Sequence, residues 1–141
     1  MRPLALALGL AAGAGAALLA LRRLDAVEVT GASMAPALLP RDRLLVESLT
    51  YARRLPRPGE VVLAADPREQ DRELIKRVVA VSAGEVQLLG DHPAASTDSR
   101  TFGAVPVDAI RWRVALRYWP PLRFGGIGSA TGSGEPWVAV G

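Results

Sequence analysis

A single lysine in an arginine-rich chain is the first feature that could carry chemistry. Of the 17 basic residues, 16 are arginine and one, Lys76, is lysine. Arginine keeps its proton near neutral pH, whereas a buried lysine can lose it and then act as a base. Lys76 is therefore a candidate general base. The alternative is an ordinary lysine whose ammonium reaches solvent from the end of a strand.

The neighbours of Lys76 favour a strand that buries its side chain. Side chains alternate between the two faces of a strand, so Lys76 shares an apolar face with Leu74, Val78 and Ala80. Burial disfavours the ammonium and lowers the pKa of a lysine, and the neutral amine can accept a proton from a hydroxyl. Arg77 lies on the opposite face and is expected to be a surface charge.

Ser33 is the candidate nucleophile for such a base. It follows a predicted strand that ends at a glycine, on a turn where its hydroxyl can be exposed, and Pro36 stiffens the chain beyond it. A turn serine that caps its own backbone is the alternative. His92 is the one histidine of the chain, so a Ser-His-Asp triad could use no other histidine.

A polar loop between residues 90 and 100 could hold the base in place. Ser96 could hydrogen-bond a nearby amine, and Asp98 could pair with Arg100 and fix the loop. Taken alone, the segment is equally typical of an ordinary turn-rich loop.

Composition excludes several other kinds of site. The chain has no cysteine, which excludes disulfides, thiolate zinc sites and a cysteine nucleophile. With one histidine it lacks the ligands of a zinc hydrolase, so we expect no metal and no cofactor. The net charge is +3, but the basic residues are dispersed and form no stripe with interleaved aromatics, so no nucleic-acid partner is expected.

The N-terminal segment is predicted to be a membrane anchor. Residues 3–21 are uncharged, and as a helix they would span about 28 Å, close to the ~30 Å of a bilayer core. A cleavable signal peptide is the alternative, although its apolar region is usually shorter and ends in a small-x-small site. We assign residues 1–23 to a retained anchor, whose flanking arginines are too balanced to fix its orientation.

The elements after the anchor predict an all-β domain. Short β-branched runs alternate with turns that contain Pro and Gly, which is typical of a small, mostly antiparallel barrel or sandwich. We assign residues 24–124 to this domain and residues 125–141, rich in Gly and Ser, to a flexible tail. The predicted strands are residues 26–30, 43–49, 60–65, 74–82, 85–89 and 111–118.

Taken together, four motifs resemble the signal peptidase I family of serine/lysine endopeptidases, and they occur in the family's order. In chain order they are Ser33-Met34-Ala35-Pro36, Pro58-Gly59-Glu60-Val61-Val62, Lys76-Arg77-Val78, and Gly90-Asp91 with Ser96-Thr97-Asp98-Ser99-Arg100. Each motif is weak alone, whereas four in order are specific, and the resemblance covers roughly residues 27 to 120.

The resemblance implies a role for each matching residue. Ser33 would be the nucleophile, and its backbone N–H would form part of an oxyanion hole. Lys76 would be the base, and Ser96 would orient its amine. Asp98 and Arg100 would support the loop. The implied fold is a mostly antiparallel β domain whose apolar rim approaches the membrane.

Three positions depart from the family pattern. Gly31 lacks the hydroxyl that gives some members a second oxyanion donor, His92 stands where Asn is usual, and Arg41 replaces a common glycine. Within the family, the compact length and residues 91–100 and 117–121 look closest to the maturation proteases of nickel-type superoxide dismutase.

The resemblance implies an endopeptidase that removes N-terminal signal or pro-segments from protein precursors after small-x-small sites. The substrate would add as an extended strand along residues 27–30 or 44–46. The enzyme would be held in the cell membrane by one span, with its catalytic domain on the outer face. Maturation of a nickel-type superoxide dismutase, in the cytoplasm, is one alternative. The other is an inert membrane-tethered β domain that binds a protein partner, with Ser33 and Lys76 too far apart to react.

Overall fold

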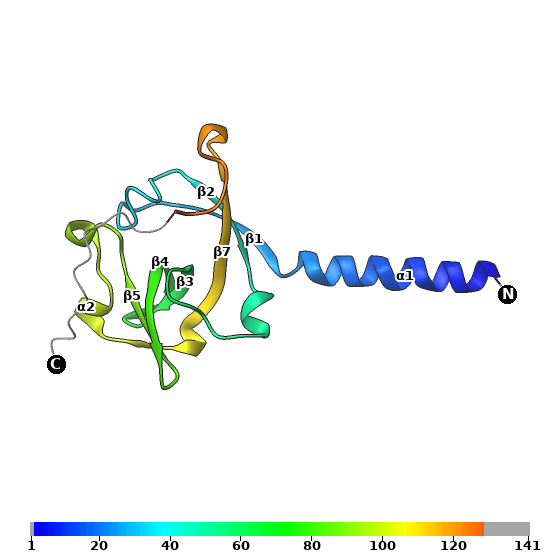
Figure 1. Ribbon diagram of the computed structural model, residues 1–141, viewed down its shortest axis with the longest axis horizontal. Coiled ribbons are helices and arrows are strands. Elements are labelled where there is room, and N and C mark those ends of the chain that lie inside the picture. The colour runs from blue at the N-terminus through cyan, green and yellow to red at the C-terminus, as the bar shows by residue number, and fades with distance from the viewer. Residues whose placement is uncertain (1, 129–141) are drawn as a thin grey trace.

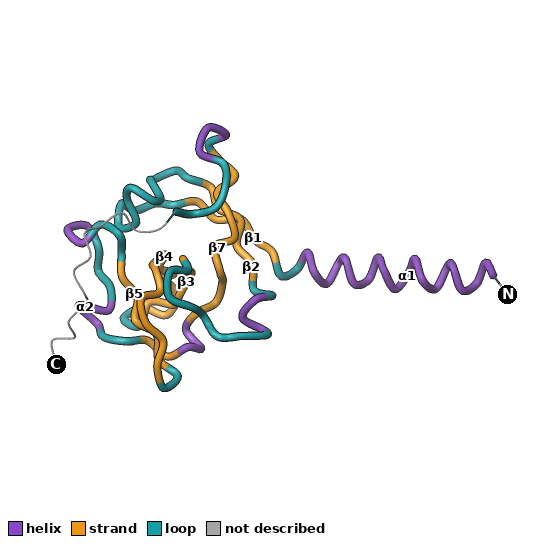
Figure 2. The backbone as a smooth tube through the Cα atoms, in the orientation of Figure 1, coloured by secondary structure: helices purple, strands orange, loops and turns teal. Residues whose placement is uncertain are grey.

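The computed structural model describes residues 2–128, which form a long N-terminal helix followed by an all-β domain. Figure 1 and Figure 2 show helix α1 (Arg2–Leu21) projecting from that domain. The strands are β1 (Leu24–Glu28), β2 (Arg43–Glu47), β3 (Val61–Asp66), β4 (Glu69–Ser82), β5 (Glu85–Leu89), β6 (Val105–Pro106) and β7 (Ile110–Trp119). The short helices are α2 (Ser99–Phe102) and the 3₁₀ turns Thr50–Ala52, Pro93–Ala95, Val107–Ala109 and Pro121–Arg123. The predicted fold class is confirmed.

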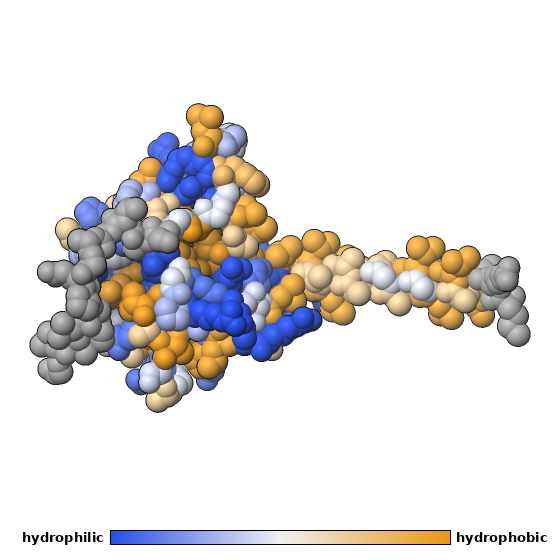
Figure 3. Space-filling view, in the orientation of Figure 1, coloured by the Kyte–Doolittle hydropathy of each residue, from blue (hydrophilic) through white to orange (hydrophobic). Residues whose placement is uncertain are grey.

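Helix α1 is apolar on all sides and contributes nothing to the core of the domain. Residues 4–21 are exposed, and their mean hydropathy is 2.2. Figure 3 shows hydrophobic colours along the length of the helix. A helix that is hydrophobic all round belongs inside a large core or a bilayer, and 20 residues span about 30 Å. By length and composition, α1 can therefore cross a membrane.

We expect the full-length protein to sediment with membranes and to resist extraction by alkaline carbonate, because α1 can bury its exposed apolar surface in lipid. A chain that begins at Leu24 should remain in the supernatant in the same fractionation. Recovery of the full-length chain in the soluble fraction without detergent would contradict a membrane anchor.

The strands form one antiparallel sheet in the order β1-β2-β7-β3-β4-β5-β6. Strand β7 joins its two halves, because residues 110–113 of β7 pair with β3 and residues 113–119 pair with β2. The serine segment follows β1 in one half and the lysine strand β4 lies in the other. The two candidate residues therefore come from separate halves of the fold.

Strand β3 is buried on both faces and so holds the two halves together. Val61 and Leu63 pack in one cluster with residues of β2, β7 and the loop after β1. Val62 and Ala64 pack in a second cluster with residues of β4, β5, β6 and β7. A strand buried on both faces reads as a continuous apolar run, as residues 61–64 do.

Strand β4 begins at Glu69, five residues before the predicted start. Its first five residues, 69–73, are polar and exposed, so they carry none of the apolar alternation that marked the rest of the strand. They are strand because β4 returns from β3 through a tight turn, in which Asp66 Oδ1 accepts from the Arg68 N–H at 2.9 Å. Strand β6 is two residues long and was not predicted.

The first residues of the predicted tail contact the domain. Gly125 pairs with Arg117 through two backbone hydrogen bonds, at 2.8 and 3.0 Å, and Ile127 packs against the first core cluster. The remainder of that tail, residues 129–141, lies outside the described residues.

Candidate active site

Ser33 lies on the loop that leaves the edge strand β1, and buried neighbours fix this loop. Met34 and Leu38 are buried in the first cluster, and the Leu38 N–H donates to the Met34 carbonyl at 2.9 Å. The Ser33 carbonyl accepts from the His92 N–H at 2.8 Å. Ser33 is therefore held against the segment that follows β5, with its side chain half-buried.

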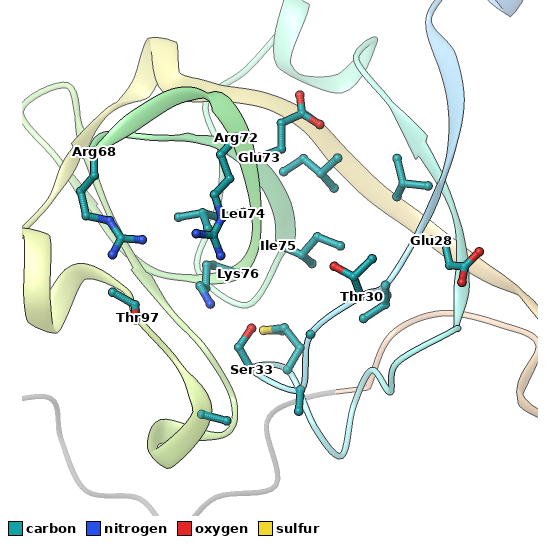
Figure 4. A pocket seen from close by; sticks show the side chains of 17 residues that line it. Glu28, Thr30, Ser33, Arg68, Arg72, Glu73, Leu74, Ile75, Lys76 and Thr97 are labelled. Atoms are coloured by element: carbon teal, nitrogen blue, oxygen red, sulfur yellow. The ribbon is translucent and has the colours of Figure 1, made fainter.

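Ser33 and Lys76 line the same cavity, whose volume is about 490 Å³. The cavity lies between residues 27–34 and the first half of β4. Figure 4 shows the Ser33 hydroxyl and the Lys76 amine directed toward one another from these two segments. The fold thus brings together two residues that are 43 positions apart in the sequence.

Burial is the main influence on the Lys76 amine. Lys76 is 4% exposed, and loss of water lowers its pKa below the ordinary lysine value. The Asp98 carboxylate acts in the opposite direction, whereas the charges of Arg100, Arg72 and Arg68 lower the pKa further. More of this amine is therefore neutral near pH 7 than for a lysine in solvent.

A hydrogen-bonded chain runs from Lys76 to a buried carboxylate. Lys76 Nζ donates to Ser96 Oγ at 3.1 Å, and Ser96 Oγ donates to Asp98 Oδ2 at 2.7 Å. Burial alone would raise the pKa of Asp98, but hydrogen bonds from Arg100, the Gly90 N–H and Ser96 together hold it at about 2. Asp98 is therefore ionised near neutral pH and accepts a hydrogen bond from the Ser96 hydroxyl. The Ser96 oxygen is then free to accept a hydrogen bond from Lys76.

The Asp98 loop is fastened at several points. Asp98 Oδ1 accepts from the Arg100 side-chain Nε at 2.9 Å and from the Arg100 backbone N–H at 3.1 Å, and so caps helix α2. Ser99 Oγ accepts from the Leu88 N–H of β5 at 2.9 Å. These contacts place Ser96 at a fixed position beside the lysine.

Gly90 provides the space for this arrangement. A Cβ at position 90 would lie 2.2 Å from Ser96 Oγ and 2.6 Å from the Ser33 carbonyl oxygen. Both distances are far inside ordinary contact distances, so any side chain here would displace the serines. The sequence motif included Gly90, but it did not indicate which two segments the glycine lets approach.

Arg77 is not the surface charge that strand alternation predicted. It is 6% exposed, and its Nε and Nη2 donate to the Asp91 carboxylate at 2.9 and 2.7 Å. Its guanidinium also donates to the carbonyls of Gly59 and Gly128. The prediction was wrong because these segments, distant in sequence, cover the outer face of β4. Arg77 thereby ties the lysine strand to the segment that contacts Ser33.

His92 is placed differently from Lys76. Its side chain is exposed and is not among the residues that line the cavity, and its backbone N–H makes the contact to Ser33. The imidazole is therefore not one of the side chains that share the cavity with Ser33 and Lys76.

Several cavity residues were not singled out from the sequence. These are Arg68, Arg72 and Thr97. Gly31, which the sequence had marked by its missing hydroxyl, also lines the cavity, and an added Cβ there would meet nothing within 4 Å. Arg72 shares a strand face with Leu74 and Lys76. This alternation could have identified Arg72, but the predicted strand began at Leu74, two residues after it.

One of the two predicted substrate edges is not free. Residues 44–46 of β2 pair with β1 on one side and with β7 on the other, so no further strand can add there. Residues 27–30, by contrast, line the cavity.

Comparison with known proteins identifies the family. The family described as "Signal peptidase, peptidase S26" matches residues 2–85 and 80–119. The chain is 35% identical to the mitochondrial ATP-independent inner membrane protease subunit 1a of Arabidopsis thaliana, over 74% of this chain and 76% of that protein. It is 29% identical to the mitochondrial inner membrane protease subunit 1 of Homo sapiens, over 70% and 72%. It is 25% identical to the probable signal peptidase I-2 of Synechocystis sp., over 72% and 66%.

The family match covers α1, the serine loop, the lysine strand and the Asp98 loop. The last three of these segments are the ones that the fold assembles around one cavity. The chain therefore belongs to the signal peptidase family of proteases, peptidase S26.

Proposed function

We propose that the chain is a serine endopeptidase in which Ser33 is the nucleophile and Lys76 is the general base. The observation that carries the proposal is the burial of the chain's one lysine at the cavity that Ser33 lines. A structural buried lysine would be paired with a carboxylate, because an unpaired buried charge is costly. Lys76 instead donates to the Ser96 hydroxyl, and among residues 2–128 it has no ion pair.

The hydrogen bonds around Lys76 suit proton transfer. A neutral amine carries two hydrogens and one lone pair, and one N–H is directed to Ser96. The lone pair can then accept the Ser33 proton as the hydroxyl oxygen attacks the scissile carbonyl. The resulting ammonium can deliver the proton to the leaving amine. The Ser33 backbone N–H would stabilise the oxyanion.

The open edge of β4 suits an extended substrate. Strand β5 pairs with β4 only from Arg77 onward, so residues 73–75 pair with β3 on one side and face the cavity on the other. Residues 27–30 form the opposite wall. A substrate strand between these walls would gain main-chain hydrogen bonds and present alternate side chains to the protein. Small side chains at the first and third positions before the cut would fit shallow sites there.

We place the catalytic domain on the outer face of the cell membrane, as expected for a protease that processes exported precursors. The experiment that tests this function offers the purified full-length protein an Ala-x-Ala signal-peptide precursor and a nickel-type superoxide dismutase precursor. We expect cleavage of the first after the second alanine, read by mass spectrometry of the products. Cleavage of the dismutase precursor alone would assign the chain to dismutase maturation, and cleavage of neither would favour an inert binding domain.

The pH dependence should report the Lys76 ionisation. Since the neutral amine is the active form, kcat/KM should rise with pH through the pKa of Lys76, which lies below the ordinary lysine value. Asp98 should contribute no transition near neutrality, because its pKa is about 2. A profile governed only by an ionisation near the ordinary histidine value of about 6.5 would contradict the assignment.

A further inference from the structure

Two arginines line the cavity and have no role in the proposed reaction. Arg68 lies in the turn between β3 and β4, and Arg72 lies on β4. Figure 4 shows both guanidinium groups on the side of the cavity where Lys76 lies. The two carboxylates of the wall, Glu28 and Glu73, are directed away from them.

Arg68 is fixed in place. Its Nε and Nη2 donate to the Asp66 carboxylate at 2.9 and 2.7 Å, and its guanidinium lies 5.6 Å from the centre of the Phe102 ring. Asp66 itself is buried. The Asp66 carboxylate offsets much of the positive charge of the Arg68 guanidinium. Arg68 therefore mainly shapes the cavity wall and is less able to bind a charged ligand.

Arg72 is the arginine whose guanidinium is available to bind a ligand. Its side chain is exposed, and within residues 2–128 it forms no ion pair and no side-chain hydrogen bond. It stands four residues before Lys76 on the same strand face, about 13 Å along the strand. Figure 4 nevertheless shows its guanidinium extending along β4 toward the Lys76 amine, inside the cavity that both residues line.

We propose that Arg72, supported by Arg68, binds an acidic side chain of the substrate within about four residues of the scissile bond. The inference rests on the proposed function, because it requires a peptide to lie along the open edge of β4. An Asp or Glu there would form a charge-assisted hydrogen bond with Arg72, whereas an uncharged peptide would leave the guanidinium unpaired. The preferred substrates are therefore small-x-small sites with an adjacent acidic residue.

A peptide series tests this inference on the full-length protein in neutral detergent. The peptides share an Ala-x-Ala site and carry Asp, Ala or Lys at one position: the second or fourth before the cut, or the first three after it. At the position that responds most, we expect kcat/KM for the Asp peptide to be about tenfold higher than for the Ala peptide. The difference between the Asp peptide and the Lys peptide should be larger still. The preference should weaken as salt is raised. Arg72→Ala should remove it, and Arg72→Glu should reverse it in favour of Lys.

The matched control is Arg53→Glu, which makes the same charge change at an exposed arginine outside the cavity and should keep the Asp preference. Equal cleavage of all peptides by the wild type would overturn the inference and leave the proposed function intact. So would an Arg72→Glu variant in which every peptide slows by the same factor, because that result indicates a structural role. A dependence on anionic lipid vesicles, with no peptide charge preference, would assign Arg72 to lipid headgroups instead. Absence of cleavage of every peptide would refute the proposed function as well.

Discussion

Replacing Lys76 with arginine is expected to lower kcat/KM by at least about 10³-fold, as far as Ser33→Ala lowers it. Arginine keeps the positive charge but cannot release its proton near neutral pH, so it cannot accept one from Ser33. Lys76→Met, which has a similar length and no charge, should be equally inactive. Cleavage of an Ala-x-Ala peptide by the purified variants measures the effect.

Two controls separate loss of the base from loss of the fold. The thermal unfolding of each Lys76 variant should show a folded domain, since Met in place of Lys leaves the buried site filled. His92→Ala should change kcat/KM only a few-fold, because the contact of His92 to Ser33 is made by its backbone N–H. Near-normal turnover by Lys76→Arg would refute the lysine mechanism, and a His92→Ala loss as large as that of Ser33→Ala would point to the histidine.

Replacing Gly90 with alanine is the second change with a large expected effect. The added methyl group would lie 2.2 Å from Ser96 Oγ and 2.6 Å from the Ser33 carbonyl oxygen, so both serines must move. Misplacement by about 1 Å can cost 10²-fold in rate, and we expect a loss of kcat/KM of about that size. Peptide cleavage measured alongside thermal unfolding separates the rate effect from any loss of folded protein.

Gly126→Ala is the matched control for the glycine substitution. Gly126 lies in the described part of the chain, and an added Cβ there would meet nothing within 4 Å. We expect it to behave like the wild type in both measurements. A folded Gly90→Ala protein with wild-type kcat/KM would show that the position of Ser96 and Ser33 does not limit the reaction.

Local sequence features predicted the elements that turns and alternation define. Five of the predicted strands begin or end at Pro, Gly or Asp turns, and each corresponds to an observed strand, although β4 starts five residues earlier than predicted. The burial of Lys76 also followed from a local pattern, the apolar neighbours at Leu74 and Val78. The apolar run of α1 was evident for the same reason, since nineteen uncharged residues need no tertiary information to be recognised.

Contacts between distant segments could not be predicted in this way. Arg77 is buried because residues near 59, 91 and 128 meet over β4, and no alternation rule includes those segments. The close approach at Gly90 depends on the loop after β1 reaching the end of β5. Arg72 was missed because it lies in a polar stretch of β4 that lacks the alternation of apolar residues by which a strand is recognised. Arg72 nevertheless lies on the same strand face as Lys76.

The most direct test of the Ser33–Lys76 assignment exploits a chain that contains no cysteine. Lys76→Cys introduces a single thiol, and alkylation with 2-bromoethylamine converts it to S-aminoethylcysteine, which restores an amine of nearly the same reach. Mass spectrometry would verify complete modification. The assignment predicts that Lys76→Cys is inactive and that alkylation restores cleavage, whereas the alkylated Ser33→Ala/Lys76→Cys protein stays inactive. A fully modified, folded protein that remains inactive, or an unmodified Lys76→Cys protein that cleaves normally, would contradict it.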